Sequence, residues 1–520
     1  MYWCFLDTGG GLLGPPHHIT FRIGPGGGGD PAGAALGGTD PFGSAAKKGA
    51  VALDHAGECN QGLGLHDLGQ MRGRTRTHAE PVHRRKWPGS PCSPLREPEE
   101  LSRSWLNSTP VRATSARKAC TSDLVARSWP HPDGSADTGR LCGYRRAMAA
   151  PSPDDLARRT ADPGWAQAFR DVPREHFIPD AAWADPMGPA PGHWIDRTID
   201  PGAWREAVYS DSVIVTQIED GATELTAESS AQTTGFTSSS SAPSHVLDFL
   251  GLLDPSPGDR VLEIGTGTGW TCALLAARIG AENVTSIEID EDIAEQAAAN
   301  LDRAGFTPHL VVGDGARGAP ERAPFDRIHV TCGVREVPYA WVAQTRPGGV
   351  IVAPWMPGNG GHKLRLTVTG DSAVGRFHGD CGYMMMRAQR PAAVTIADDE
   401  RESIARVDPR RIDRAGTGFQ VALQGAVPGI TAAGGASADG TFLLVLSDGS
   451  GSHARARHAP GSGRTQVVQR GPQNLWDEVE AAYLRWVGWG EPGRDRFGLT
   501  VTREGHHIWL DTPDNHITGA

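Results

Sequence analysis

The stretch VLEIGTGTGW, residues 261–270, decides the fold of this chain. Its first half is a short apolar run that predicts a buried strand, and Gly265, Gly267 and Gly269 then alternate with threonines. An apolar segment with helical spacing follows. Because glycine permits a tight turn and the close approach of a ligand to the main chain, the stretch predicts a strand, a ligand-binding loop and a helix. Nucleotide-binding folds of several classes share such a loop, so the choice among possible ligands depends on the residues around it.

Short apolar strands and amphipathic helices alternate around this loop as far as about residue 356. The predicted strands are 260–265, 283–290, 309–314, 326–331 and 348–355, and the predicted helices are 270–280, 291–305 and 338–345. Regular alternation of this kind implies a mainly parallel sheet covered on both faces, which is a doubly wound, Rossmann-like α/β fold. Residues 363–370 and 372–379 predict an added hairpin.

Composition divides the chain into three predicted domains: a low-complexity extension over 1–147, the α/β domain over 148–388 and an accessory domain over 389–520. The extension is rich in Gly, Pro, Arg, His and Ser and has no apolar period, so we expect it to be disordered. The alternatives are a basic regulatory tail, a His/Cys metal site, or a native chain that begins at Met148. The His and Cys spacings match no zinc pattern, so no metal is expected.

The segments that flank the alternating region are less regular. Residues 152–173 predict one or two short helices. Residues 187–236 are rich in Gly, Pro, Ser and Thr and are expected to be irregular apart from a strand at 211–218, with 221–237 resembling a linker.

Beyond residue 390 the pattern predicts a small α+β domain. Its expected strands are 440–449, 464–471, 497–505 and 506–513, and its expected helix is 474–490. Trp476, Tyr483, Leu484 and Trp486 of this helix are available to pack, and its Trp-rich face is expected to lie in a core, because aromatic residues contribute much of the area that cores bury.

Composition also limits the kind of protein. The formal net charge of −11 and the pI of about 5.9 lack the basic footprint of a nucleic-acid-binding protein. No run of about 18 apolar residues predicts a membrane span. The 8 cysteines have no regular spacing and do not form a disulfide framework. We therefore expect a cytoplasmic monomer without nucleic-acid or membrane partners.

Acidic residues occur near the carboxyl ends of three predicted strands. Glu263 precedes the glycine loop, Glu288 ends the next strand, and Asp314 stands beside Gly315 after the third. Ligands of open α/β sheets bind at that edge, and a carboxylate there can accept both hydroxyls of a ribose. Three carboxylates suit a positively charged nucleoside better than a pyrophosphate, so S-adenosylmethionine is favoured over NAD. As alternatives, Glu288 could only adjoin a helix N-terminus, and Asp314 could only form a turn.

At this point the chain resembles a known family. The segments VPREHFIP, VYSD, SSSSAPS, VLEIGTGTGW, SIEID, GDGARGAPERAPFDRIHVT and RPGGVIVAP occur in the order seen in protein-L-isoaspartate O-methyltransferases, over about residues 151–356. The resemblance implies a class I methyltransferase fold. It also implies methyl transfer from S-adenosylmethionine to an isoaspartyl carboxylate, giving an ester that cyclises to a succinimide. The expected cofactor-binding residues are Glu263, Gly265, Thr266, Gly267, Gly269, Glu288, Asp314 and Gly315.

The same resemblance points to a substrate-facing serine. The family has it just before a helix, in a segment that corresponds here to residues 239–243, so the matching residue is Ser241. We expect Ser241 to bind the acceptor carboxylate together with free N–H groups of the helix that Pro243 begins. Ser240 or Ser239 could substitute for it. The alternative is that these serines only cap the helix.

Two departures from the family concern the substrate. Tyr209 and Asp211 are kept, but the Pro/Gly part that follows them in the family is missing, and the chain before Ser239 is well over a dozen residues longer. The tail 496–513 resembles those of actinobacterial methyltransferases that accompany peptide-maturation systems. Three hypotheses follow: a methyltransferase for isoaspartyl residues of damaged proteins, a tailoring methyltransferase for aspartate in a ribosomally made precursor peptide, and a non-catalytic S-adenosylmethionine-binding scaffold.

Overall fold

The computed structural model describes residues 151–358, 360–391 and 399–518. The predicted disordered extension over 1–147, with its tail, metal-site and later-start alternatives, lies outside these residues. Within them the strands form three sheets, of nine, four and five strands.

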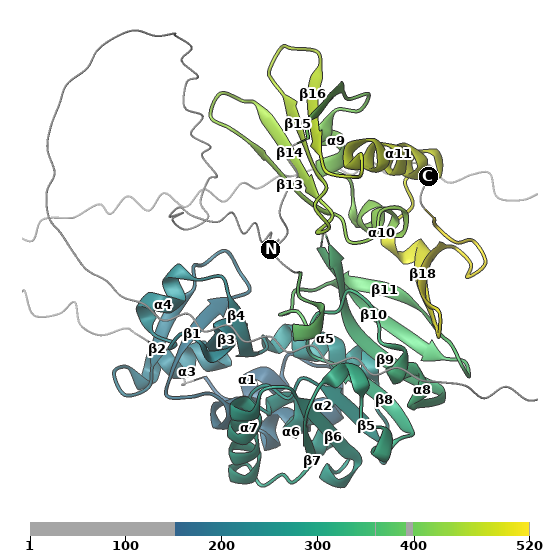
Figure 1. The fold of residues 1–520 in the computed structure, drawn as a ribbon. Helices are drawn as coiled ribbons and strands as arrows, with labels where there is room; N and C mark the ends of the chain where they lie inside the picture. The colour runs from purple at the N-terminus through teal and green to yellow at the C-terminus, as the bar shows by residue number, and fades with distance from the viewer. Residues whose placement is uncertain (1–150, 359, 392–398, 519–520) are drawn as a thin grey trace, which may run out of the picture. The chain divides into compact units, whose positions relative to one another are not determined.

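The centre of the nine-stranded sheet is the predicted parallel unit (Figure 1). Its strands are β5 (Val261–Ile264), β6 (Val284–Glu288), β7 (His309–Val312), β8 (Phe325–Val330) and β9 (Thr345–Gly358). They are adjacent in the order β7-β6-β5-β8-β9 and all pair in parallel. The chain therefore builds the sheet outward in both directions from β5, and the order reverses between β5 and β8. The doubly wound α/β prediction is confirmed.

Helices connect most of these strands as the sequence predicts: α6 (Trp270–Ile279), α7 (Glu291–Arg303) and the short α8 (Tyr339–Ala343). Helix α5 (Pro243–Leu253) precedes β5 and leads into it from β4 of another sheet. Helix α6 begins directly after Gly269, and the side chain of Asp290 caps α7 by accepting from the N–H of Ile293 at 3.1 Å. Both helix starts therefore lie at the carboxyl edge of the sheet, where the predicted ligand loop ends.

The added hairpin is present and the sheet continues beyond it. Strands β10 (Gly360–Val368) and β11 (Ala373–Asp380) pair antiparallel next to β9. Strands β17 (Phe497–Thr502) and β18 (Gly505–Leu510) then extend the same sheet from β11. The last part of the chain thus contributes strands to two sheets. Strands from both sides of the boundary predicted at residue 389 pair with each other, since β11 pairs with β17.

The four-stranded sheet lies before the glycine loop in sequence. Its strands are β1 (Ala181–Pro186), β2 (His193–Asp196), β3 (Ser212–Ile218) and β4 (Phe236–Ser240), in the order β2-β1-β3-β4. The helices of this region are α1 (Pro153–Ala157), α2 (Pro163–Asp171), α3 (Pro201–Tyr209) and α4 (Ala227–Gln232). The strand predicted at 211–218 is confirmed as β3. The expectation that the rest of 187–236 is irregular was wrong, because β2, α3 and α4 form there. The expectation of a linker-like 221–237 was wrong as well, because α4 has a reciprocal Thr226–Ser229 capping box and a buried Ser230.

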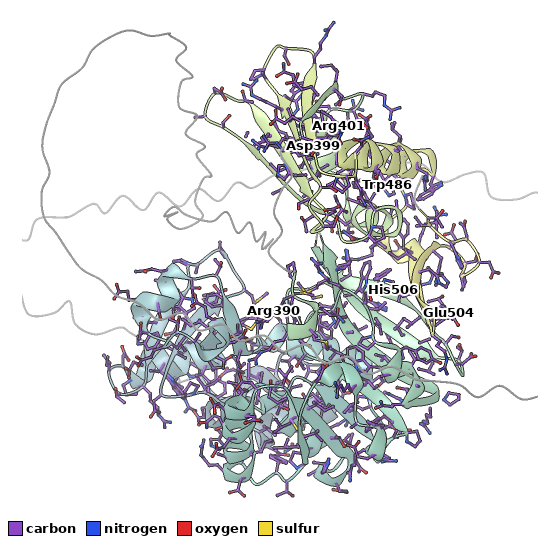
Figure 2. All side chains as sticks on the ribbon, viewed as in Figure 1. Arg390, Asp399, Arg401, Trp486, Glu504 and His506 are labelled. Atoms are coloured by element: carbon purple, nitrogen blue, oxygen red, sulfur yellow. The ribbon has the colours of Figure 1, made fainter. Side chains whose placement is uncertain are left out.

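The five-stranded sheet and its helices belong to the C-terminal part. The strands are β12 (Arg401–Ile404), β13 (Thr431–Ala436), β14 (Phe442–Ser447), β15 (His453–His458) and β16 (Thr465–Arg470). The helices are α9 (Pro409–Asp413), α10 (Thr417–Ala426) and α11 (Leu475–Gly488). Trp476 and Trp486 of α11 are buried, as predicted, and Figure 2 marks the position of Trp486. Leu484 was expected to pack with them, but its side chain is exposed. Among the described residues no helix is long and apolar enough to cross a membrane.

Candidate functional site

The glycine loop after β5 has the backbone that only glycine adopts without strain. Gly265, Gly267 and Gly269 have φ values of +94°, +55° and +89°. A Cβ on Gly265 would lie 2.5 Å from the Thr331 hydroxyl oxygen, and one on Gly269 would lie 3.2 Å from Cγ of Leu301. The loop is thus fixed against β8 and α7, and its main chain stays accessible to a ligand.

Glu263 is fully buried beneath this loop. It stands opposite Ser286 of β6 and His329 of β8 in the parallel register. The Ser286 hydroxyl donates to Oε2 of Glu263 at 2.6 Å, and the Thr266 hydroxyl lies 2.7 Å from that of Ser286. Oε1 of Glu263 has no hydrogen-bond partner among the described residues. Glu263 and Thr266 therefore belong to one buried polar row that supports the loop from below.

Glu288 reaches the loop from the end of β6. Its Oε2 accepts from the N–H of Gly267 at 2.9 Å, and its Oε1 accepts from the N–H groups of Ile289 and Asp290 at 2.9 and 3.2 Å. The carboxylate is therefore held at the loop, half-buried, and Oε2 keeps one acceptor site for a hydroxyl group of a ligand. Glu288 does adjoin the start of α7, as the alternative predicted, but it also contacts the glycine loop through Gly267.

Asp314 and Gly315 follow β7 at the same edge. Oδ1 of Asp314 accepts from the N–H of Ala316 at 3.0 Å and so begins a 3-10 turn at Gly315–Arg317. A Cβ on Gly315 would lie 2.5 Å from Cγ2 of Ile264, so only glycine lets this turn pack on β5. The turn role predicted as the alternative for Asp314 is therefore present, and a ligand role must use its other oxygen.

Residues 238–240 of the serine run form the end of β4, Ser241 follows directly, and burial alternates along the run as it does in a strand. Ser238 and Ser240 are buried, whereas Ser239 and Ser241 are partly accessible. A Cβ on Gly267 would lie 3.3 Å from the Ser239 carbonyl oxygen. Strand β4 therefore ends directly against the glycine loop, and the accessible serines lie beside it.

Ser240 has a different environment from the one predicted. Its hydroxyl accepts from Nε of Arg174 at 3.3 Å, and both groups are buried. Ser241 keeps a partly accessible hydroxyl. The two serines named as candidate substrate binders thus point to opposite sides, and only Ser241 keeps that candidate role.

The start of α5 also differs from expectation. Its N-cap is Ala242, and within the described chain no side chain of that cap residue or of the serine run caps the helix. Instead Oδ1 of Asp211 accepts from the N–H of Ser244 at 2.9 Å. The capping alternative for the serines is therefore wrong. The expectation that the N–H groups at this helix start are free to bind the acceptor is also partly wrong, because the N–H of Ser244 already donates to Asp211.

Tyr383 is a candidate residue that the sequence did not indicate. It lies in the segment that follows β11, and its ring stacks on His245 with centroids 5.8 Å apart. Burial raises the pKa of Tyr383, and a hydrogen bond with the Ser241 side chain acts in the opposite direction. The phenol is thus protonated at neutral pH and lies beside Ser241. Nothing local in the sequence marks Tyr383, because the contact depends on the hairpin that brings it back over α5.

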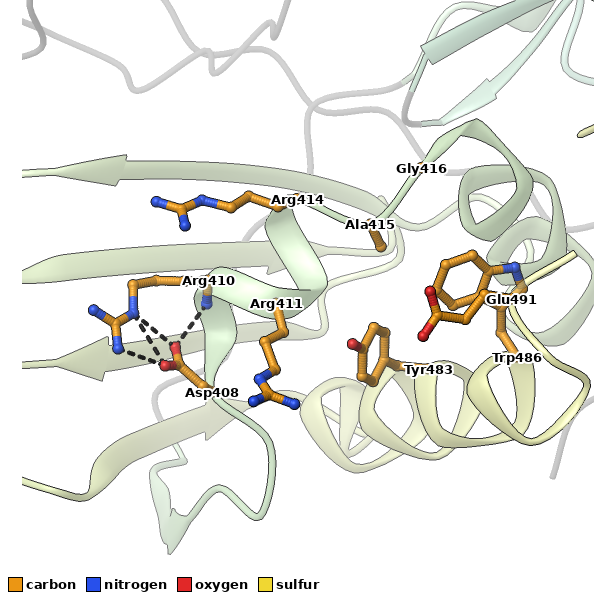
Figure 3. Close-up of a pocket in the computed structure, with 9 residues that line it drawn as sticks. All are labelled: Asp408, Arg410, Arg411, Arg414, Ala415, Gly416, Tyr483, Trp486 and Glu491. Carbon is orange, nitrogen blue, oxygen red and sulfur yellow. Dashed lines mark hydrogen bonds and ion pairs between the residues drawn. The ribbon is translucent and has the colours of Figure 1, made fainter. Parts of the chain in front are cut away.

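Two further features are unsuited to the chemistry of the site. Burial raises the pKa of Cys332 to about 12, so its thiol stays protonated, as expected of a structural cysteine. A hollow of about 630 Å³ lies in the C-terminal part between α9 and α11 (Figure 3). Its basic side chains do not converge: Arg410 is paired with Asp408, and Arg414 points away from Tyr483.

The chain is similar in sequence to known protein-L-isoaspartate O-methyltransferases. A family model described as protein-L-isoaspartate(D-aspartate) O-methyltransferase matches residues 218–381. A protein-L-isoaspartate O-methyltransferase of Methylorubrum extorquens is 34% identical over 215 residues, which are 41% of this chain and 76% of the relative. That of Pyrococcus horikoshii is 44% identical over 115 residues, 22% of this chain and 52% of the relative. A solved protein-L-isoaspartate O-methyltransferase structure aligns with 69% of this chain and 98% of its own, at 23% identity and a TM-score of 0.41.

The order of the parallel strands and the left-handed glycine loop define an α/β protein of the class I methyltransferase type. Within that class, the chain belongs to the protein-L-isoaspartate O-methyltransferase family. The chain spans about half the length of several of the curated relatives it matches, at 52%, 52% and 49% of their residues.

Proposed function

We propose that the chain is an S-adenosylmethionine-dependent carboxyl O-methyltransferase that acts on isoaspartyl, or aspartyl, residues of proteins or peptides. The product is a methyl ester that can cyclise to a succinimide. The observation that carries this proposal is the meeting of β4 with the glycine loop. The Ser239 carbonyl oxygen is 3.3 Å from the position of a Cβ on Gly267, and the accessible Ser241 lies two residues further on.

The residues around the loop fit S-adenosylmethionine. The three left-handed glycines present main chain rather than side chains, and Glu288 places a carboxylate beside Gly267. Asp314 and Gly315 lie at the same edge, while the buried Glu263 and Thr266 support the loop from below rather than facing a ligand. The set contains acids and no lysine or arginine, which suits a cationic nucleoside. When bound, S-adenosylmethionine supplies an activated methyl group on a sulfonium.

On the acceptor side the chain has to bind and orient a carboxylate. That group is ionised at neutral pH, so no residue needs to remove a proton from it. The Ser241 hydroxyl and the protonated Tyr383 phenol can both donate to it. Their role is to align the acceptor oxygen and to exclude water, which accounts for most of what an enzyme adds to such a transfer.

A second candidate is a tailoring methyltransferase for aspartate in a ribosomally made precursor peptide. Two observations favour it over general repair. The segment before Ser239 folds into β3, a turn and α4, and so gives the acceptor side an ordered surface of its own. The family match ends at residue 381, yet two strands from beyond it continue the same sheet.

One assay tests these functions together. Radiolabelled methyl transfer is measured to an isoaspartyl peptide, to the same peptide with aspartate, and to one with asparagine. We expect transfer to the isoaspartyl peptide and none to the asparagine control. Preference for ordinary aspartate would favour tailoring, and cofactor binding without transfer to any acidic peptide or precursor would leave only the scaffold.

A further inference from the structure

We propose that Arg174 is a positioning residue: its side chain holds the end of β4 against the start of α6, and so fixes Ser241 relative to the cofactor loop. The inference rests on the proposed function for the role of Ser241. Its structural part, that Arg174 fixes residues 240–241, does not depend on which acceptor is used.

Arg174 lies in a 3-10 turn, Arg174–Phe177, and is fully buried. Its guanidinium makes five hydrogen bonds, all to oxygens that are not carboxylates. Nη1 donates to Val208 O at 2.7 Å, Nη2 donates to the carbonyls of Ser212, Ser240 and Ser241 at 3.0, 3.1 and 2.9 Å, and Nε donates to the Ser240 hydroxyl at 3.3 Å. Three of the five contacts thus fall on the serine pair.

The same guanidinium also lies over the ring of Trp270, 4.9 Å from its centroid. Trp270 is the first residue of α6 and follows Gly269 directly. Its indole N–H donates to Val172 O at 3.4 Å, two residues before Arg174. A single side chain therefore contacts both the segment that carries Ser241 and the helix that the cofactor loop begins.

The planar guanidinium of Arg174, and not its charge alone, makes this arrangement specific to arginine. Burial lowers its pKa to about 9, and Asp211 acts in the opposite direction, so the group is still a cation at neutral pH. A buried cation is tolerated only where its hydrogen bonds are satisfied. The planar fork reaches carbonyls in several directions at once, whereas a lysine ammonium in the same place keeps the charge but cannot span them.

Substitution of Arg174 should have different effects if the residue only stabilises the fold and if it positions Ser241. In the first case, substitution lowers stability, cofactor affinity and turnover together. In the second, cofactor affinity is kept and the acceptor step is lost. The matched control is Arg327, whose guanidinium also donates to backbone carbonyls, of Leu253 and Asp254 at 3.0 and 3.2 Å, at the opposite end of α5 from Ser241.

The experiment compares Arg174→Lys, Arg174→Gln and Arg327→Gln in the full chain. For the isoaspartyl peptide we expect kcat/KM to fall about 10- to 100-fold in both Arg174 variants, because small misplacements of an acceptor group cost that much. The Kd of S-adenosylmethionine should change less than about threefold, a difference below 1 kcal/mol. Arg327→Gln should leave both constants near wild type. Equal losses of cofactor affinity and kcat/KM in Arg174→Lys would overturn the proposal.

A double-mutant cycle tests whether Arg174 acts through Ser241. In a Ser241→Ala background the further loss from Arg174→Lys should shrink to about twofold or less, since coupled residues are not additive. A full additional loss would contradict the proposal. If the Arg174 variants do not fold, Ser240→Ala removes one of the five contacts. It should still lower kcat/KM by about threefold with unchanged cofactor binding, and no loss there would equally overturn the proposal.

Hydrogen exchange separates this inference from the proposed function. In Arg174→Lys the amides of residues 238–246 should exchange faster, while those of β5 stay protected. If wild type methylates no acidic peptide but this exchange change occurs, the positioning role holds and the proposed acceptor is wrong. If transfer occurs and neither exchange nor kcat/KM changes in the variant, the positioning role is wrong and the function stands.

Discussion

Substitutions of single residues can distinguish the two halves of the proposed site. In the site we propose, the cofactor half is made of backbone and carboxylates at strand ends, whereas the acceptor half consists of hydroxyl groups from the residue after β4 and from the segment after β11. Ser241 belongs to the second half and Glu288 to the first. Substituting one residue from each half should therefore affect different constants.

Ser241→Ala removes the accessible hydroxyl beside the glycine loop. We expect kcat for the isoaspartyl peptide to fall about 10-fold or more, because a hydrogen bond to a charged group is worth roughly 1.5–3 kcal/mol. The Kd of the cofactor should hardly change. Steady-state kinetics and calorimetric titration measure the two values. Ser238→Ala, at a buried serine of the same strand, is the control, and a collapse of cofactor binding in Ser241→Ala would contradict the assignment.

Glu288→Gln replaces the carboxylate that contacts Gly267. We expect the Kd of S-adenosylmethionine to rise about 10- to 100-fold, because a hydrogen bond to a charged group is worth roughly 1.5–3 kcal/mol. Turnover at saturating cofactor should be largely kept. Glu295→Gln, at an exposed position of α7, is the control. Unchanged cofactor affinity in Glu288→Gln, measured by titration calorimetry, would remove this residue from the cofactor site.

At the scale of elements, the turn after β3 is tied to the segment after β11. Oδ1 of Asp220 lies 3.0 Å from Nε of Arg387, and its Oδ2 lies 2.5 Å from Nη1 of Arg390, which Figure 2 labels. Nη2 of Arg387 also lies 2.5 Å from Oδ2 of Asp290, which caps α7 two residues after Glu288. Glu219 and Asp220 have φ values of +49° and +54°, so these contacts hold a turn that non-glycine residues seldom adopt.

Asp220→Asn should loosen this connection. The groups are partly exposed, so we expect the unfolding free energy to fall by no more than about 1 kcal/mol. Amides of residues 217–222 and 385–390 should exchange faster, and the difference from wild type should shrink in high salt because the ion pairs are screened. Asp371→Asn, in an exposed loop, should show neither change. Equal exchange in Asp220→Asn and wild type would show that the ion pairs do not hold the turn.

At the scale of the whole molecule, the described residues bury two clusters of apolar side chains. One of them joins β5 and β8 to α11 and β17. The C-terminal part is thus packed into the same core as the methyltransferase sheet, rather than joined to it by a linker alone.

Leu499→Ala tests this shared core, since Leu499 is fully buried on β17 opposite Ile508. We expect the unfolding free energy to fall by about 2–5 kcal/mol through loss of burial and a residual cavity. Unfolding should remain one cooperative transition, and activity per folded molecule should be kept. Leu484→Ala, whose side chain is 43% exposed, is the control. A separate early transition in Leu499→Ala would show that residues 389–520 unfold independently.

His362 makes the stability depend on pH. It is buried on β10, and burial lowers its pKa to about 4, with Arg494 acting in the same direction. An unfolded histidine titrates near 6.5, so between pH 6.5 and about 4 the unfolded chain binds the extra proton. The stabilisation is complete above pH 6.5 and is lost as the pH falls through that window, by an amount on the order of 3 kcal/mol.

His362→Gln should therefore flatten the acid side of the stability curve measured by denaturant unfolding between pH 7 and pH 4. The exposed His309 provides a control as His309→Gln, whose curve should follow wild type. An unchanged slope in His362→Gln would show that another group is responsible.

Local pattern was enough for the centre of the molecule. The glycines of residues 265–269 and the alternation of strands around them predicted the parallel sheet, and the proposed cofactor edge rests on the same short-range geometry. Within 187–236 only the strand at 211–218 was predicted, because it alone has an apolar run; β2, α3 and α4 were missed, since they are short and are stabilised by packing rather than by propensity. The capping of α5 was also misjudged, because Asp211 lies 33 residues from its partner Ser244.

The sequence by itself therefore determined the class of fold, the family and the cofactor edge, which depend on residues close together in the chain. Only the tertiary structure decided which serine is accessible, that Arg174 joins Ser240 and Ser241 to Trp270, and that Tyr383 returns to Ser241. These contacts join residues far apart in the chain: Arg174 and Ser240 are 66 positions apart, and Ser241 and Tyr383 are 142 positions apart. No local pattern encodes such pairings, because they depend on how sheets and helices pack after each has formed.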